Sequence, residues 1–149
     1  YLIMNKKYIL LSVLVFSFGV HAEKIQSIED YLNLHADDNQ EAVASYLSKR
    51  CAATFLVVAK IFNNENKPDD KKVSDTMANS AMKMIEMATY VDASVVNRDL
   101  LEIAPEVNAE VERIFDILWE ISEDSYARSA VYLTPHVDDL KACQLFAQP

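Results

Sequence analysis

The chain has 149 residues and a formal net charge of −9, which is enough length for one domain. An acidic surface without a cluster of Lys and Arg repels phosphate backbones, so the composition argues against nucleic-acid binding. The only glycine is Gly19, near the N-terminus. Phosphate-binding loops, dinucleotide fingerprints and nucleophile elbows need glycine where the backbone turns tightly, so the rest of the chain lacks these enzyme motifs.

Residues 1–22 predict a secretory signal peptide, with Met4 as its start and residues 1–3 upstream of it. Lys6 and Lys7 precede an apolar run, and the small residue Ala22 stands where a signal peptidase cleaves. The run is short for a membrane span and is followed at once by Glu23, which favours cleavage over anchoring. We therefore expect a periplasmic or secreted protein, with no membrane attachment after cleavage and with residues 23–149 forming a single helical domain.

The residues that follow predict two helices. Ser27 is typical of a helix N-cap, and the first helix should be short and end near His35 or Ala36. The second, over residues 38–64, begins with Asp38 as cap and a glutamate three residues later, the spacing of a capping box. Apolar residues recur along it in steps of three and four, so one face is continuous and should form the core: Val43, Leu47, Cys51, Thr54, Val58 and Ile61.

Three further helical segments are predicted. Pro68 suits the first position of a helix that should reach about Tyr90. Residues 92–101 are less regular and favour a turn and a short helix, and Pro105 should start or kink a long element over 105–133. The pattern of that element weakens at 123–125, so its continuity is left open. A last helix should have Thr134 as cap and Pro135 at its start.

No stretch alternates with the period of two that a strand requires, so the predicted fold is all-α. Four principal helices and a short first one indicate a small antiparallel bundle.

Cys51 and Cys143 are the only cysteines, and both lie on the predicted inner faces of their helices. A secreted chain meets oxidising conditions, so we expect an inter-helix disulfide between them. The alternative is a redox-active pair, but the Cys-x-x-Cys spacing of such sites is missing.

Met77, Met82, Met84 and Met87 crowd one predicted helix. The favoured interpretation is flexible core filling. The alternative is a soft-metal site for Cu(I), to which Met77, Met84 and Met87 could contribute, because Met82 points away from Met84 on a helix. Neither His35 nor His136 has a second metal-binding residue one helical turn away of the kind that zinc sites on helices show. We expect His35 to be a loop residue and His136 to be an exposed residue near a helix start. No metal or cofactor is otherwise expected.

Two rows of acidic residues spaced by four follow the long element. Like charges so arranged cost helix stability and need a compensating cation, either Arg113 or a basic partner. The rows should face away from the apolar stripe, toward solvent or a docking partner. The acidic residues expected to bind a partner are Glu106, Glu110, Glu112, Asp116 and Glu120.

Without the signal the chain would keep all 23 acidic and 12 of its 14 basic residues, a net charge of about −11. No arrangement of nucleophile and base stands out, so we expect a protein that is not an enzyme. The sequence favours an interaction protein, such as an inhibitor, an immunity factor or a chaperone-like module, that binds a basic protein through its acidic surface. The alternative is a bundle that carries an apolar ligand or a soft metal ion. The oligomeric state does not follow from the sequence.

Overall fold

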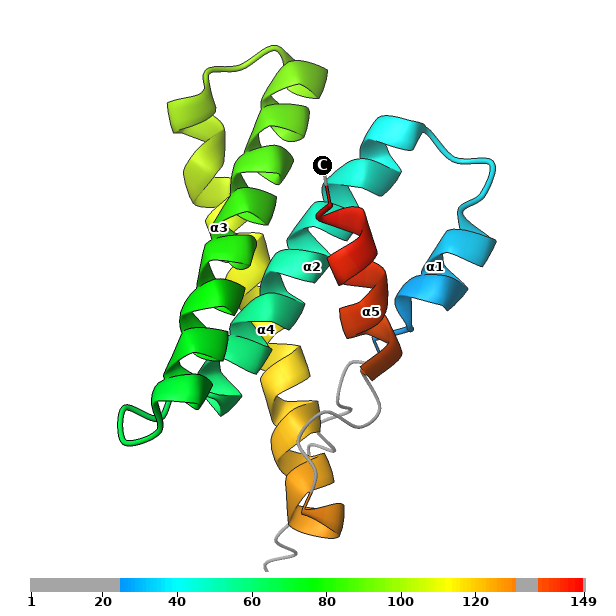
Figure 1. The fold of residues 1–149 in the computed structure, drawn as a ribbon. Helices are drawn as coiled ribbons and strands as arrows, with labels where there is room; N and C mark the ends of the chain where they lie inside the picture. The colour runs from blue at the N-terminus through cyan, green and yellow to red at the C-terminus, as the bar shows by residue number, and fades with distance from the viewer. Residues whose placement is uncertain (1–24, 131–136, 149) are drawn as a thin grey trace, which may run out of the picture.

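The computed structural model describes residues 25–130 and 137–148, and within these ranges it contains five helices and no strand. The prediction of an all-α bundle with an inter-helix disulfide is confirmed. The expected signal peptide lies outside the described residues, as do the expected cap Thr134, Pro135 and His136. The helices are α1 (Ile28–Leu34), α2 (Gln40–Ile61), α3 (Pro68–Val96), α4 (Leu100–Ser129) and α5 (Val137–Phe146) (Figure 1).

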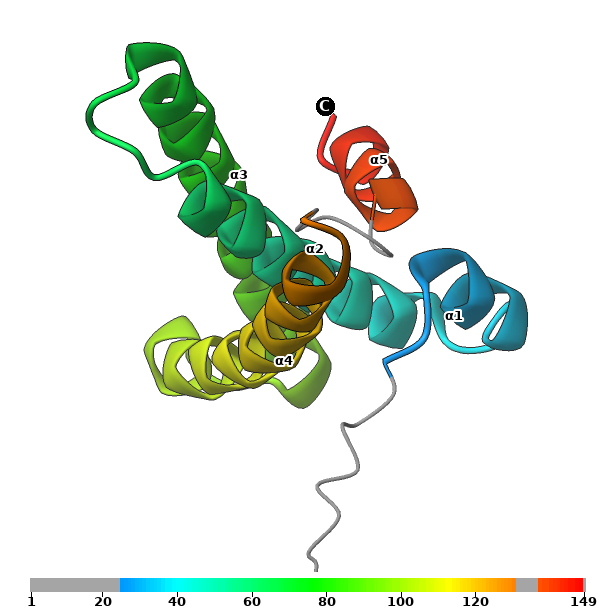
Figure 2. The same cartoon turned by 90° about the horizontal axis from the view of Figure 1, so that it is seen from below.

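Helix α2 lies at the centre of the bundle. It contacts α3, α4 and α5, which lie on different sides of it, and α1 packs beside α5 (Figure 2). Buried residues therefore recur around α2 from Ser45 to Ala59, including Phe55 and Val58. Its length and apolar composition would also suit a membrane-crossing helix, but here most of its apolar stretch is buried by the other helices.

The first two helices start with side-chain caps. Ser27 caps α1 as predicted, with its hydroxyl accepting from the backbone N–H of Asp30 at 3.1 Å. The predicted cap Asp38 is wrong by one residue, because Asn39 accepts the N–H of Glu41 at 2.7 Å and thus caps α2. Asp38 instead contacts Nδ1 of His35 at 2.6 Å, and His35 is the C-cap of α1 rather than a loop residue.

Helix α3 is longer than predicted, and α4 begins earlier than predicted. Helix α3 continues past Tyr90 to Val96, so the expected turn lies at residues 97–99 and no separate short helix forms over 92–101. Asn97 ends α3 in the left-handed conformation, φ 52°, which asparagine tolerates better than most residues. Asp99 then caps α4 by accepting the N–H of Leu101 at 2.8 Å.

Helix α4 begins before Pro105, and the proline lies inside it. At this sixth position of α4 the missing N–H removes one backbone hydrogen bond, yet the helix continues through the proline. It also runs unbroken through 123–125, where the apolar pattern weakens, as far as Ser129. The small side chains of Ser122 and Ser125 are buried there, so they continue the inner face.

The disulfide joins the centre of the bundle to its last helix. Cys51 on α2 and Cys143 on α5 are bonded, with their Cα atoms 5.2 Å apart. Both side chains are buried. The bond closes a long loop, since the cysteines are 92 residues apart in the sequence. In the chain-entropy model such a loop stabilises the fold by roughly 4 to 5 kcal/mol.

A buried ion pair lies on the same interface. Nη2 of Arg50 on α2 is 2.6 Å from Oδ2 of Asp139 on α5, and the side chains are 0% and 3% exposed. The other carboxylate oxygen of Asp139 accepts the N–H of Ile28 at 2.9 Å, so this carboxylate also fixes the start of α1. Nε and Nη1 of Arg50 have no hydrogen-bond partner within the described part of the chain. The burial of Arg50 therefore depends strongly on Asp139, because an unpaired buried charge is costly.

Removing the disulfide should lower stability without changing the fold. We expect Cys51→Ala combined with Cys143→Ala to reduce the free energy of unfolding by roughly 3 to 5 kcal/mol, because the unfolded chain regains its loop entropy. Urea denaturation followed by circular dichroism measures this difference. A loss below about 1 kcal/mol would contradict the expected role of the bond.

Removing only one partner of the buried ion pair should lower stability strongly, because the other charge stays buried without its partner. Arg50→Met and Asp139→Leu should each lower the free energy of unfolding by about 3 to 5 kcal/mol, since each leaves one buried charge unpaired. The double variant should lose markedly less than the sum of the two losses. Lys71→Met, at the exposed pair with Asp75, is the matched control and should cost less than about 1 kcal/mol. Additive losses in the double variant would show that Arg50 and Asp139 are not coupled.

Candidate interaction surface on the long helix

Helix α4 has an apolar face and, on its opposite side, an acidic face. Val107, Val111, Ile114 and Leu118 recur at three- and four-residue spacing and are all buried against the bundle. The acidic residues between them fall on the other side of the helix. The structure thus places the predicted acidic rows mainly in solvent, and it gives the two rows different surroundings.

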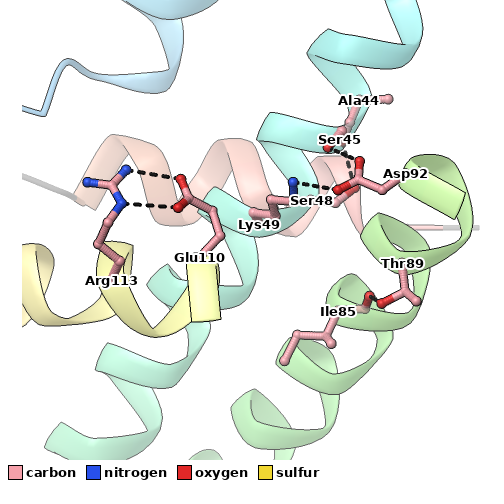
Figure 3. Close-up of polar contacts among 9 residues, drawn as sticks. All are labelled: Ala44, Ser45, Ser48, Lys49, Ile85, Thr89, Asp92, Glu110 and Arg113. Carbon is pink, nitrogen blue, oxygen red and sulfur yellow. Dashed lines mark hydrogen bonds and ion pairs between the residues drawn. The ribbon is translucent and has the colours of Figure 1, made fainter. Parts of the chain in front are cut away.

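The first row, formed by Glu102, Glu106 and Glu110, is paired with arginines. Nε of Arg98, in the α3–α4 connection, is 3.3 Å from Glu102, and its Nη1 is 2.9 Å from Glu106. Arg113 donates two hydrogen bonds to Glu110, at 3.1 and 3.0 Å (Figure 3). The bonds from Arg113 hold the pKa of the Glu110 carboxyl below its ordinary value of 4.5. Local cations therefore offset much of the charge of this row.

The second row continues along α4 as Glu112, Asp116, Glu120 and Glu123. All four are exposed. None forms an ion pair with another residue in the part of the chain that the structure describes. This row is thus an uncompensated line of negative charge along one side of the helix, which destabilises α4 and attracts cations.

A cleft lies beside the first row. Its volume is about 480 Å³, and Glu106 and Glu110 are among its lining residues. At its α2–α3 wall, Asp92 accepts a hydrogen bond from the hydroxyl of Ser45 and pairs with Nζ of Lys49 at 2.6 Å (Figure 3). In a Ser–Lys catalytic pair, a neutral lysine takes the serine proton. Here both side chains bind Asp92, so the contact joins α2 to α3 and does not form such a pair.

A second groove runs on another side of α4, between α2, α3 and the acidic second row. Its volume is about 570 Å³. Nζ of Lys60, one of its lining residues, lies 3.9 Å from the ring centre of Trp119 and 5.5 Å from that of Phe115, a cation–π contact. The lining residues are Leu56, Ala59, Lys60, Asn63, Ser74, Ile85, Asn108, Val111, Glu112 and Phe115.

The methionines of α3 lie at different depths. Met84 is 2% exposed in the core, Met77 is half-buried against it, and Met82 and Met87 are exposed. Met84 acts as core filling, the favoured interpretation, while Met87 lies at the surface. The described residues contain no group of three His, Cys, Asp or Glu side chains able to hold a metal ion. Cu(I) binding by Met77, Met84 and Met87 stays a prediction.

The residues that join the helices through polar contacts do not stand out in the sequence. Lys49 and Arg50 appear in the sequence as a basic pair, yet one binds Asp92 and the other binds Asp139. The buried ion pair between Arg50 and Asp139 could have been predicted from the expected disulfide. Arg50 precedes Cys51, and Asp139 lies one helical turn before Cys143, so a bond between the cysteines brings these charges together.

The Glu110–Arg113 pair should have a measurable titration. Because Arg113 lowers the pKa of Glu110 in the folded chain, the pair stabilises the fold above pH 4.5, and this contribution is lost as pH falls through the folded pKa. The stabilisation should be about 0.5 kcal/mol or less, since both side chains are partly exposed. Carboxyl-detected NMR should show the Glu110 midpoint rising toward 4.5 in Arg113→Met and staying unchanged in the control Arg128→Met. An unchanged midpoint in Arg113→Met would contradict this assignment.

Comparisons with protein-family models, curated proteins and solved structures find no match.

Proposed function

We propose that this chain is a periplasmic or secreted interaction protein that binds a basic partner protein through the acidic surface of α4. The observation that carries the proposal is the second acidic row, Glu112 to Glu123, which is exposed and lacks cation partners among the described residues. Aligned like charges reduce the stability of a helix. A basic partner would relieve this repulsion and would be drawn to the surface by long-range attraction.

The disulfide supports the proposed location. A buried cystine between α2 and α5 indicates that the chain folds in an oxidising compartment. The finer assignment, to a periplasm or to the extracellular space, rests on the signal peptide expected over residues 1–22. An acidic, cystine-linked bundle suits an inhibitor, an immunity factor or a chaperone-like module in such a compartment.

A second candidate function is the carriage of an apolar ligand. It is favoured by one observation, the 570 Å³ groove, whose lining includes apolar side chains of α2, α3 and α4. The exposed Met82 lies one turn from Ile85 in the α3 wall, and methionine surfaces adapt to varied ligands.

The main proposal predicts a partner that is released by salt. Chain 23–149, immobilised and exposed to periplasmic or culture-fluid proteins of its own host, should retain a basic protein at low ionic strength and release it at about 0.5 M salt. Replacing the second row by Gln at Glu112, Asp116, Glu120 and Glu123 (Asn at 116) should abolish retention. Mass spectrometry identifies the protein eluted.

A charge-matched control separates the surface from overall charge. Glu29→Gln, Asp37→Asn, Glu65→Gln and Glu41→Gln remove four exposed acids elsewhere and should leave retention unchanged. If both sets of substitutions reduce retention equally, net charge rather than the α4 row is responsible. If no salt-released protein is retained, the proposal fails.

A further inference from the structure

The groove beside α4 is open to solvent. Its lining residues on α3 are Ser74 and Ile85, which are eleven residues apart along the helix and therefore about 16 Å. This length equals about three turns of an α-helix. A small apolar molecule in an open groove would leave much of its surface in water, whereas ligand pockets bury most of the ligand. The shape therefore fits a helix laid along it better than an enclosed small molecule.

The floor and walls of the groove offer apolar contacts. Leu56 and Ala59 come from α2, Ile85 from α3, and Val111 and Phe115 from α4. A helix that binds such a groove presents an apolar stripe with side chains at three- and four-residue spacing.

Charge is distributed unevenly along the groove. Glu112 lines the α4 wall, and Asp116 and Glu120 follow it at successive turns of the same helix face, all exposed and without an ion pair among the described residues. The groove also contains a cation, Lys60, but its ammonium lies against the ring of Trp119, which is not among the lining residues. The α4 edge is therefore negative, and it complements a positive flank on the occupant.

We propose that the groove between α2, α3 and α4 docks an amphipathic helix of a partner protein, with its apolar face against Leu56, Ile85 and Phe115 and a Lys- and Arg-rich flank along Glu112, Asp116 and Glu120. The inference rests on the proposed function and specifies the partner's binding segment. It assigns the apolar groove and the unpaired acids to a single site, in which the groove supplies buried area and the acids orient the bound helix.

The test uses synthetic peptides of about four helical turns and chain 23–149 with its disulfide intact. One peptide has Leu at three- and four-residue spacing with Lys elsewhere. A second has Glu in place of Lys, and a third has the Leu and Lys of the first in strict alternation. Fluorescence anisotropy should show binding of the first peptide, weakened by salt, and at least about tenfold weaker binding of the other two.

Variants of the chain separate the groove from the acids. Asn108 is exposed and lines the groove, so Asn108→Trp should fill its mouth and weaken peptide binding at least about tenfold. Asn79→Trp, on an exposed position of α3 outside the groove lining, is the matched control and should bind as the parent does. Replacing Glu112, Asp116 and Glu120 by Gln, Asn and Gln should weaken binding about tenfold and reduce its salt dependence. Circular dichroism and thermal midpoints confirm that each variant is folded.

The outcomes distinguish this inference from the proposed function. If the acidic-row variant weakens binding and Asn108→Trp does not, the peptide binds the acids outside the groove, so this inference fails while the proposed function stands. If neither variant nor salt changes binding, both fail. If dodecanol binds the chain saturably and the peptide does not displace it, the groove belongs to a small apolar ligand and the inference is overturned.

Discussion

The fold is stable only when other helices cover α2 on nearly every side. Most surface helices have one apolar stripe and one polar face, but α2 is buried around much of its circumference between Ser45 and Ala59. Such a helix is unstable in water unless several neighbours pack on it. Helices α3 and α4, both long, cover part of this surface. The short α5 covers another part, and a covalent bond and a buried ion pair hold it there.

Much of this architecture could be predicted because apolar spacing and cap residues act locally. The N-cap Ser27 and the helix start at Pro68 are read directly from the sequence. The predicted end of α3 near Tyr90 is too early, because α3 continues until Asn97 takes up a left-handed conformation. Likewise, Pro105 did not mark a helix start, since the cap at Asp99 precedes it.

The candidate surface on α4 could be predicted only in part. The spacing of the acids places them on the solvent side of α4, but it does not say which of them find cations. Arg98 pairs with the first row from outside the helix, and this contact depends on how the α3–α4 connection folds. The groove is even less visible in the sequence, because three separate helices contribute its walls. Asp138 and Asp139 show the same limit: the two are adjacent and chemically alike, yet only Asp139 shares a helix face with Cys143 and is buried.

The positions of the two bonded cysteines also set an order of events. A ribosome makes the chain from its N-terminus, so Cys51 emerges long before Cys143, which follows it by 92 residues. During that interval the thiol of Cys51 has no partner within its own chain. The covalent closure of the bundle therefore cannot occur before α5 has been made, and a chain that is cut short before α5 keeps a free sulfhydryl at Cys51 in place of a cystine.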